Sequence, residues 1–106
     1  MDIQLKKGIL ELCVLYAIRN GESYGYKIIS DLQGIIEISE STLYPILKRL
    51  ESGGYVTTRT AEYSGRLRRY YKITNLGLGK LASGRSDLQE INAIYRKIFQ
   101  NQRWED

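Results

Sequence analysis

The sequence predicts a mainly α-helical fold with a small β-hairpin and a long C-terminal helix. Three observations predict it. Apolar residues recur at helical spacing through the first half of the chain, the period changes to two between residues 55 and 73, and a heptad-like spacing of apolar residues follows Thr74. With 106 residues, the chain has room for one compact domain and one further element that serves an interface.

The first predicted helix, residues 5–19, is apolar on nearly every side. It contains the run ILELCVLYAI, and a helix of this kind has to be buried. We therefore expect it to be the central core helix, ended by Asn20 and Gly21. Cys13, the only cysteine, lies in this run, so an intrachain disulfide is impossible and a buried structural thiol is expected.

The second predicted helix is short and leads directly into a third. Ser23 is its expected N-cap, and Gly34 is expected to end it. Its apolar stripe consists of Ile28, Ile29 and Leu32. Two short helices with a tight connection are what a helix-turn-helix requires.

The third predicted helix begins after Ser39, which can cap it, and ends at Gly53 and Gly54, which can adopt the left-handed conformation. At about 100° per residue, one face is apolar and the opposite face is polar and basic. The apolar face consists of Leu43, Ile46, Leu47 and Leu50, and the polar one of Ser41, Tyr44, Pro45, Lys48 and Arg49. Pro45 lies past the first turn, where it must either cost a backbone hydrogen bond or move the start of the helix to a later residue.

The polar face of this third helix indicates a function. Hydroxyls, an aromatic ring with a polar tip and two cations can reach base edges and phosphates when a helix lies in a DNA major groove. The alternative is an ordinary solvated face.

A β-hairpin follows the third helix. Residues 55–63 and 66–73 are rich in β-branched and aromatic residues, with Ser64 and Gly65 as the turn between them. Alternation places one set of side chains on each face: Arg66, Arg68, Tyr70 and Lys72 on one, and Leu67, Arg69, Tyr71 and Ile73 on the other. The cationic hairpin can lie along phosphates or enter a minor groove, and the alternative is a solubilising edge hairpin.

The positive charge is confined to one segment. The net charge is +4, yet residues 48–72 contain seven cations and two acids, a net charge of +5 in that segment alone. Such a patch is the electrostatic footprint of a polyanion-binding protein.

The last predicted helix begins after Thr74 and carries a heptad-like seam. Its members are Leu81, Leu88, Ile91, Tyr95 and Ile98, with Gly84 in the one empty slot. Because the first three helices already supply a core, the expected partner of this seam is a second copy of the chain. The alternative is that the helix folds back on its own domain, bending at its glycines. Trp104 is also expected to pack, on the partner chain or elsewhere.

The sequence lacks the residues that an enzyme, a metal-binding protein or a membrane protein would need. The chain has no histidine and one cysteine, and its acids are scattered, so we expect neither a catalytic site nor a metal or cofactor site. No apolar run is long enough for a membrane span, and the first residues do not form a signal peptide, so we expect no membrane contact and a cytoplasmic location.

Several stretches resemble the PadR family of bacterial transcriptional regulators, in its short form with a single C-terminal dimerisation helix. They are residues 22–26 (ESYGY), 41–51 (STLYPILKRLE), 53–56 (GGYV), 65–71 (GRLRRYY) and 74–77 (TNLG). Each stretch is short, but their order and spacing together are specific. The resemblance covers most of residues 9–77.

The resemblance implies a homodimeric winged helix-turn-helix repressor of transcription. Residues 1–74 would form the DNA-binding domain and residues 75–106 the dimerisation helix. The third helix would read the major groove of a two-fold symmetric, double-stranded operator, and the hairpin, or wing, would touch flanking backbone or the minor groove. By position, the groove-facing residues would be Ser41, Thr42, Tyr44 and Lys48, with Arg49 as a further cation on this helix, and the wing contacts would be Arg66 and Arg68.

The sequence departs from the family pattern at two positions. Leu67 stands where the wing usually has proline. Members that bind flat aromatic drugs resemble one another in a tryptophan at the dimer centre, and the matching residue here is Leu88. An aromatic sandwich is therefore not expected at that position, and a small-molecule effector would have to use Tyr95, Phe99 or the first helix.

A second function class fits the same features. A winged helix can dock a protein partner instead of DNA, and nine tyrosines would supply the anchors for such an interaction module. Salt separates the two hypotheses, because duplex binding weakens steeply with ionic strength and an aromatic contact does not.

Overall fold

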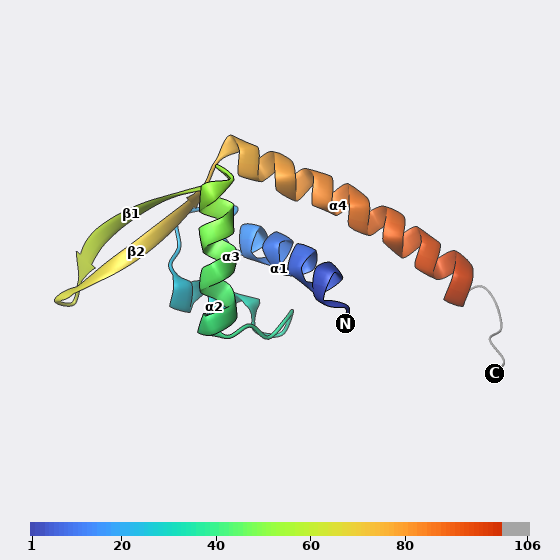
Figure 1. Cartoon of the computed structure of the whole chain (residues 1–106), viewed down its shortest axis with the longest axis horizontal. Helices are drawn as coiled ribbons and strands as arrows, with labels where there is room; N and C mark the ends of the chain where they lie inside the picture. Colours follow the sequence, from blue (N-terminus) through green and yellow to red (C-terminus); the bar gives the residue numbers. More distant parts are fainter. Residues whose placement is uncertain (101–106) are drawn as a thin grey trace.

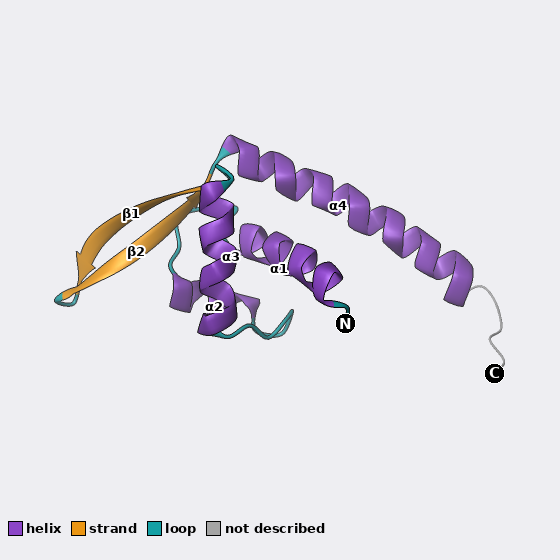
Figure 2. Ribbon diagram, viewed as in Figure 1, coloured by secondary structure: helices purple, strands orange, loops and turns teal. Residues whose placement is uncertain are grey.

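The computed structural model describes residues 1–100 and confirms the predicted fold class: four helices and one antiparallel hairpin, arranged as a winged helix-turn-helix (Figures 1 and 2). In chain order the elements are α1 (Ile3–Ala17), α2 (Gly25–Leu32), α3 (Glu40–Ser52), β1 (Val56–Tyr63), β2 (Arg66–Ile73) and α4 (Asn75–Tyr95), which continues as a π-helical turn, Arg96–Gln100. The molecule measures 60 × 26 × 21 Å, with the hairpin and α4 projecting from opposite sides of the helical core (Figure 1).

The core lies where α1, α2 and α3 meet the base of the hairpin. Its fully buried side chains come from all of these elements: Val14, Leu15, Ile18, Ile28, Leu32, Leu43, Leu47, Leu50 and Val56. Burying apolar area of this kind is the main favourable contribution to folding. The core therefore holds α3 against α1 and α2 and leaves its other face to solvent.

The prediction for α3 is confirmed for its N-cap and its apolar face. The Ser39 hydroxyl accepts a hydrogen bond from the backbone N–H of Thr42, as an N-cap does. All four predicted core residues of this helix are buried, and Pro45 lies inside the helix on its exposed side. Gly54 takes the predicted left-handed conformation, with a φ of 79°. The same prediction for Gly53 is wrong: its φ is −81°, because it is the C-cap residue and still continues the right-handed turn of the helix.

The prediction that Ser23 caps α2 is wrong. The helix begins two residues later, its N-cap is Tyr24, and no side chain caps it. Ser23 is instead buried and forms a β-bridge with Tyr71, with backbone hydrogen bonds of 3.0 and 2.8 Å. Pairing with the hairpin holds Ser23 in extended backbone, and this tertiary contact takes precedence over its local preference as a cap.

The hairpin has the predicted strands and turn. Its register runs from Val56 opposite Ile73 to Tyr63 opposite Arg66. Ser64 and Gly65 both have positive φ, as two-residue type I′ hairpin turns require. Its base is anchored in the core by Val56 and Tyr71, and its tip is exposed.

The expectation that α1 is buried on all sides is only partly right. Its buried residues are Leu10, Val14 and Leu15, whereas Leu12 and Cys13 are half-buried and Tyr16 is 42% exposed. The reason is that α2 and α3 cover one side of α1, and α4 covers only part of the other (Figure 1).

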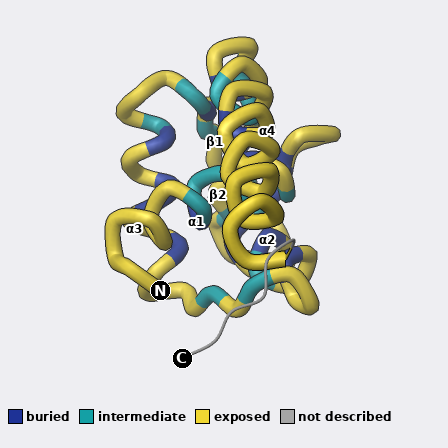
Figure 3. The backbone as a smooth tube through the Cα atoms, turned by 90° about the vertical axis from the view of Figure 1, so that its right-hand side faces the viewer, coloured by how far each residue is buried: buried dark blue, intermediate teal, exposed yellow. Residues whose placement is uncertain are grey.

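Helix α4 begins as predicted, with the Thr74 hydroxyl accepting a hydrogen bond from the backbone N–H of Gly77. Its first half packs on α1, where the Leu12 side chain fills the space beside Gly84. Beyond that point α4 is exposed along its length (Figure 3). Trp104 lies outside the described residues. Within residues 1–100, no helix combines the length and hydrophobicity needed to cross a membrane.

Candidate nucleic-acid interface

The exposed face of α3 presents a row of three polar side chains. Ser41, Tyr44 and Lys48 are spaced three and four residues apart, so they lie one above the other along the helix. All three are exposed, and Lys48 makes no ion pair with any of the described residues. Pro45 has no N–H to donate to the carbonyl of Ser41, so this row also carries a backbone acceptor without its helical partner.

Thr42 lies at the start of the same helix, and its hydroxyl belongs to the cap. The Ser39 hydroxyl donates to the Thr42 hydroxyl oxygen at 3.1 Å and lies 3.0 Å from that of Ser41. These hydrogen bonds hold the short polar side chains in place at the N-terminus of α3, where residues 39–42 are all exposed.

Arg49 lies on a different side of α3 from this row. Its Nε donates to Glu11 of α1 at 3.4 Å, and the other carboxylate oxygen of Glu11 lies 3.7 Å from Lys80 of α4. Glu11 thus joins three helices. The structure does not bring Arg49 together with Tyr44 and Lys48.

A groove of about 670 Å³ separates α2 and α3 from the hairpin. Its lining includes Tyr44, Arg66 and Arg68, so the structure brings one residue of the α3 row together with both predicted wing residues. The Tyr44 hydroxyl packs against Gly25 so closely that any side chain at Gly25 would overlap it.

The groove is also lined by tyrosines that the sequence did not place in a DNA interface. They are Tyr24 and Tyr26, beside the start of α2, and Tyr63, the last residue of β1. Strand alternation places Tyr63 on the same face of the hairpin as Ala61, which pairs with Arg68, so the sequence could have predicted that Tyr63 lies near Arg68. The proximity of Tyr24 to Arg68 depends on the tertiary fold.

Arg68 is held between two of these rings. Its guanidinium carbon lies 3.8 Å from the ring centre of Tyr24 and 3.7 Å from that of Tyr63. The ring of Tyr70 is 5.9 Å away and packs edge-on against Tyr24. We call Tyr24, Tyr63 and Tyr70 the Arg68 cage.

Two ion pairs fix the hairpin to the helical core. Arg59 donates two hydrogen bonds to the Glu22 carboxylate, each 2.7 Å long, and stacks over the Tyr70 ring at 4.6 Å. The hydrogen bonds from Arg59 hold the pKa of Glu22 below its usual value. Such bidentate pairs are the most geometrically specific of charged contacts.

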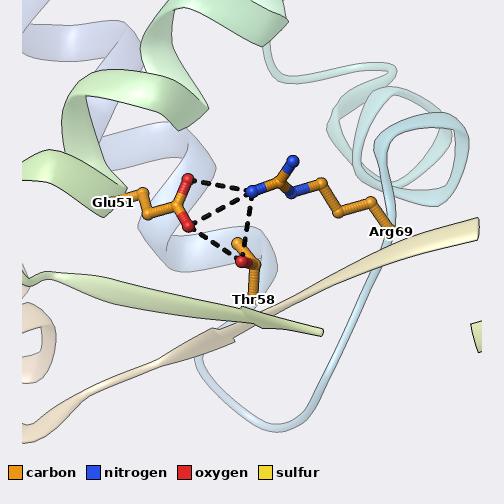
Figure 4. Close-up of polar contacts among 3 residues, drawn as sticks. All are labelled: Glu51, Thr58 and Arg69. Atoms are coloured by element: carbon orange, nitrogen blue, oxygen red, sulfur yellow. Dashed lines mark hydrogen bonds and ion pairs between the residues drawn. The ribbon is translucent and has the colours of Figure 1, made fainter. Parts of the chain in front are cut away.

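The second pair joins the end of α3 to both strands (Figure 4). The Thr58 hydroxyl donates to the Glu51 carboxylate at 2.8 Å, and Arg69 donates to both carboxylate oxygens at 3.3 Å. Arg69 is thereby occupied on the inner face of the hairpin. Arg66, next to the turn, is exposed and makes no ion pair within residues 1–100.

The predicted dimerisation seam lies along α4. Leu81 is half-buried against the core, and four further members are exposed: Leu88, Ile91, Tyr95 and Ile98. An open, largely apolar groove of about 1070 Å³ runs between α4 and α1 and includes Leu81, Leu88 and the half-buried Leu12 and Cys13. The ring centres of Tyr95 and Phe99, the two aromatic residues expected to contact an effector, are 5.5 Å apart, and neither residue lines that groove.

Residues 1–100 contain no group of three or more side chains that could hold a metal ion. Burial raises the pKa of the Cys13 thiol, which makes it a poor nucleophile at neutral pH.

Known proteins share the sequence pattern and the fold of this chain. The model of the transcriptional regulator PadR-like family matches residues 14–83. Transcriptional regulator Rv3488 of Mycobacterium tuberculosis is 29% identical over 89 residues, which is 83% of each chain. The crystal structure of a PadR family regulator from Eggerthella lenta superimposes with a TM-score of 0.82 at 29% identity, covering 94% of this chain and 89% of that one.

One further similar structure contains DNA. The structure of Bacillus subtilis PadR in complex with operator DNA matches with a TM-score of 0.67 at 29% identity, covering 71% of this chain and 45% of that one. The matched family consists of transcriptional regulators, which confirms that the chain is not an enzyme. From its three-helix core, its wing and the family match across residues 14–83, the chain belongs to the PadR-like family of transcriptional regulators.

Proposed function

We propose that this regulator is a homodimeric repressor that binds a two-fold symmetric site on double-stranded DNA. The observation that carries the proposal is the groove between α3 and the hairpin. Tyr44, from the exposed row of α3, lines it together with Arg66 and Arg68 of the wing. A helix and a cationic ribbon that face one another across such a groove match the geometry of a major groove and its flanking phosphates. The solved complex of Bacillus subtilis PadR with operator DNA supports the same partner.

Within this proposal the exposed row has distinct roles. Ser41 and Tyr44, with the hydroxyl of Thr42, would contact base edges, while Lys48 and Arg66 would contact phosphates. Lys48 and Arg66 are suited to this because they are exposed and form no ion pair with the described residues. Arg49 is already paired with Glu11 and would contribute charge at longer range.

The dimer would form through α4 and the exposed side of α1. Residues 75–106 would be the dimerisation segment and residues 1–74 the DNA-binding domain. The exposed apolar residues Leu88, Ile91 and Tyr95 continue from the groove beside α1, and an exposed apolar surface of this extent is typical of an interface. Two copies joined in this way would present two α3 helices to two half-sites.

The experiment is selection of a randomised duplex pool on the purified protein while the salt concentration is raised. A retained two-fold symmetric motif, with half-sites about one helical turn apart, is the expected result. Repression is then measured with a reporter whose promoter overlaps that motif. Retention without a motif would overturn sequence-specific binding, and no retention would favour the protein-interaction module.

A small-molecule effector would bind in the groove between α1 and α4, where this groove adjoins the proposed dimer interface. This groove is mainly apolar and is lined by Leu12, Cys13 and Leu81. A flat aromatic probe that raises the melting temperature and lowers operator affinity would support ligand response. A probe that changes neither would contradict it.

A further inference from the structure

The cations of the basic segment differ in how they are held. Arg49, Arg59 and Arg69 are each paired with a carboxylate, on Glu11, Glu22 and Glu51 respectively. Arg68 has no carboxylate partner among the described residues and is only partly exposed. It is the cation that the tyrosines of the Arg68 cage surround.

The two nearest rings of the cage come from different parts of the fold. Arg68 pairs with Ala61 across the hairpin, which makes Tyr63 its diagonal neighbour on the same face. Tyr24 precedes α2 and belongs to the helical core. The guanidinium at 3.7 Å from one ring and 3.8 Å from the other therefore joins the outer half of the hairpin to the helix pair.

The same contact continues to α3. Tyr24 is followed by Gly25, whose backbone packs against the Tyr44 hydroxyl of α3. A chain of contacts thus runs from the exposed row of α3, through the start of α2 and the Arg68 cage, to the wing. The Glu22 and Glu51 pairs hold the hairpin through Arg59 and Arg69, and the Arg68 cage adds a contact that includes Tyr63, the last residue of β1 before the turn.

Resting on the proposed DNA binding, we infer that Arg68 is a positioning residue: its stacking between Tyr24 and Tyr63 sets the wing at a fixed angle to α3, and Arg66 makes the phosphate contact. This assigns Arg68 a role different from the direct wing contact that the family resemblance implies. Both faces of its guanidinium are covered by rings, which leaves it little freedom to follow a phosphate.

Arginine and lysine separate the two roles. Both carry a positive charge, but only the planar guanidinium can stack on two rings at once. A residue that contacts a phosphate as a point charge tolerates lysine, whereas a stacked residue does not. Arg68→Lys therefore removes the positioning and keeps the charge, and Arg66→Lys keeps the charge at the proposed phosphate contact two residues away.

The first experiment measures operator affinity as a function of salt for these variants on the duplex selected above. Arg68→Lys is expected to lose about tenfold in affinity with an unchanged salt slope. Arg66→Lys, at the proposed phosphate contact, is expected to keep the salt slope because the charge is kept, and Arg66→Ala is expected to lower the slope by about one. The inference is overturned if Arg68→Lys binds like the wild type, or if Arg68→Ala lowers the slope as Arg66→Ala does.

Ring variants give a second, independent readout. Tyr63→Leu should weaken operator binding as much as Arg68→Lys does. Tyr63→Phe, which keeps the ring, should bind the operator like the wild type. The double variant Arg68→Lys/Tyr63→Leu should be no weaker than either single one, because both remove the same stack. If Arg68 left the cage to contact DNA, Tyr63→Leu would bind equally well or more tightly, which would contradict the inference.

Wing orientation can also be measured without DNA. Cys13 is the only cysteine, so spin labels at Leu67→Cys and Gln33→Cys in a Cys13→Ser background report the distance between the wing and α2. Labelled protein is diluted with unlabelled protein so that only distances within one chain are observed. Arg68→Lys should broaden the distance distribution and Arg66→Lys should not. An unchanged distribution overturns the inference, whereas a broadened one in a protein that binds no duplex overturns the proposed function alone.

Discussion

Gly77, in the first turn of α4, packs directly against the carbonyl oxygen of Tyr55 in the turn that follows α3. The Thr74 hydroxyl donates to the carbonyl of Gly54 at 2.7 Å, and the Thr74 N–H donates to the same Tyr55 carbonyl at 3.0 Å. These contacts fasten the start of α4 to the end of α3. They determine the direction in which α4 leaves the core.

Gly77→Ala should therefore destabilise the fold. A methyl group at this position overlaps the Tyr55 carbonyl and the Ile73 side chain, and a backbone carbonyl cannot rotate out of the way as a side chain does. We expect a loss of about 1–3 kcal/mol in the free energy of unfolding. Thermal and denaturant unfolding at a fixed protein concentration measure it.

Gly79→Ala is the matched control in the same turn of helix. Nothing lies within 4 Å of the position that its added methyl group would take. It should raise stability by up to about 1 kcal/mol, because alanine has the higher helix propensity. Equal effects of the two substitutions would contradict the close packing at Gly77.

Lys48 and Arg49 are sequence neighbours with different expected effects on DNA binding. Lys48→Ala should weaken operator binding and lower the salt slope by about one, because an unpaired cation that contacts a phosphate is lost. Arg49→Ala should change the slope less and the melting temperature more, since Arg49 joins α3 to α1 through Glu11. Affinity at several salt concentrations, with melting curves for both variants, separates the effects. A slope that falls equally in both would contradict the assignment.

Glu22 should make the attachment of the wing sensitive to acid. Hydrogen bonds from Arg59 lower the pKa of Glu22 in the folded protein below its ordinary value of 4.5. A lowered folded-state pKa contributes stability that is complete above pH 4.5 and is lost as the pH falls below that value. Melting temperatures of the wild type and Glu22→Gln should thus differ at neutral pH and converge in acid. A difference that is constant with pH would exclude the ion pair as its source.

Thr58→Val tests the contact between α3 and the hairpin in Figure 4. Valine keeps the shape and strand preference of threonine but loses the hydroxyl that Glu51 and Arg69 both contact. We expect a loss of about 0.5–1.5 kcal/mol, measured by denaturant unfolding. Thr57→Val is the control, because the Thr57 side chain is exposed on the neighbouring position. A loss of the same size in the control would point to the strand and away from the hydrogen bonds.

Ile91→Asp tests the proposed dimer. The exposed Ile91 side chain lies in the predicted seam, and a charge buried there without a partner opposes association. We expect the variant to sediment as a monomer and to lose most of its operator affinity while the fold of residues 1–74 is kept. Glu90→Ala, at an exposed residue next to it, should leave association unchanged. A wild type that is monomeric at micromolar concentration would remove the basis of this prediction.

The order of the helices and strands and the two faces of α3 follow from local patterns in the sequence. Leu43, Ile46 and Leu47 recur at helical spacing, and the same spacing puts Ser41, Tyr44 and Lys48 on the opposite side, so period and polarity are read directly from the chain. The turn at Ser64 and Gly65 and the caps at Ser39 and Thr74 were predictable for the same reason. Each depends on residues within one turn of the chain.

Contacts between distant parts of the chain select which cations of the basic segment remain unpaired and which parts of α1 stay exposed. Arg59 meets Glu22 and Arg68 meets Tyr24 across more than thirty positions of the sequence, and no local pattern encodes such contacts. Ser23 lost its expected role as a cap for the same reason, because pairing with Tyr71 outweighs a local preference. Local periodicity predicts the direction in which a side chain faces, and long-range packing decides which residues it contacts.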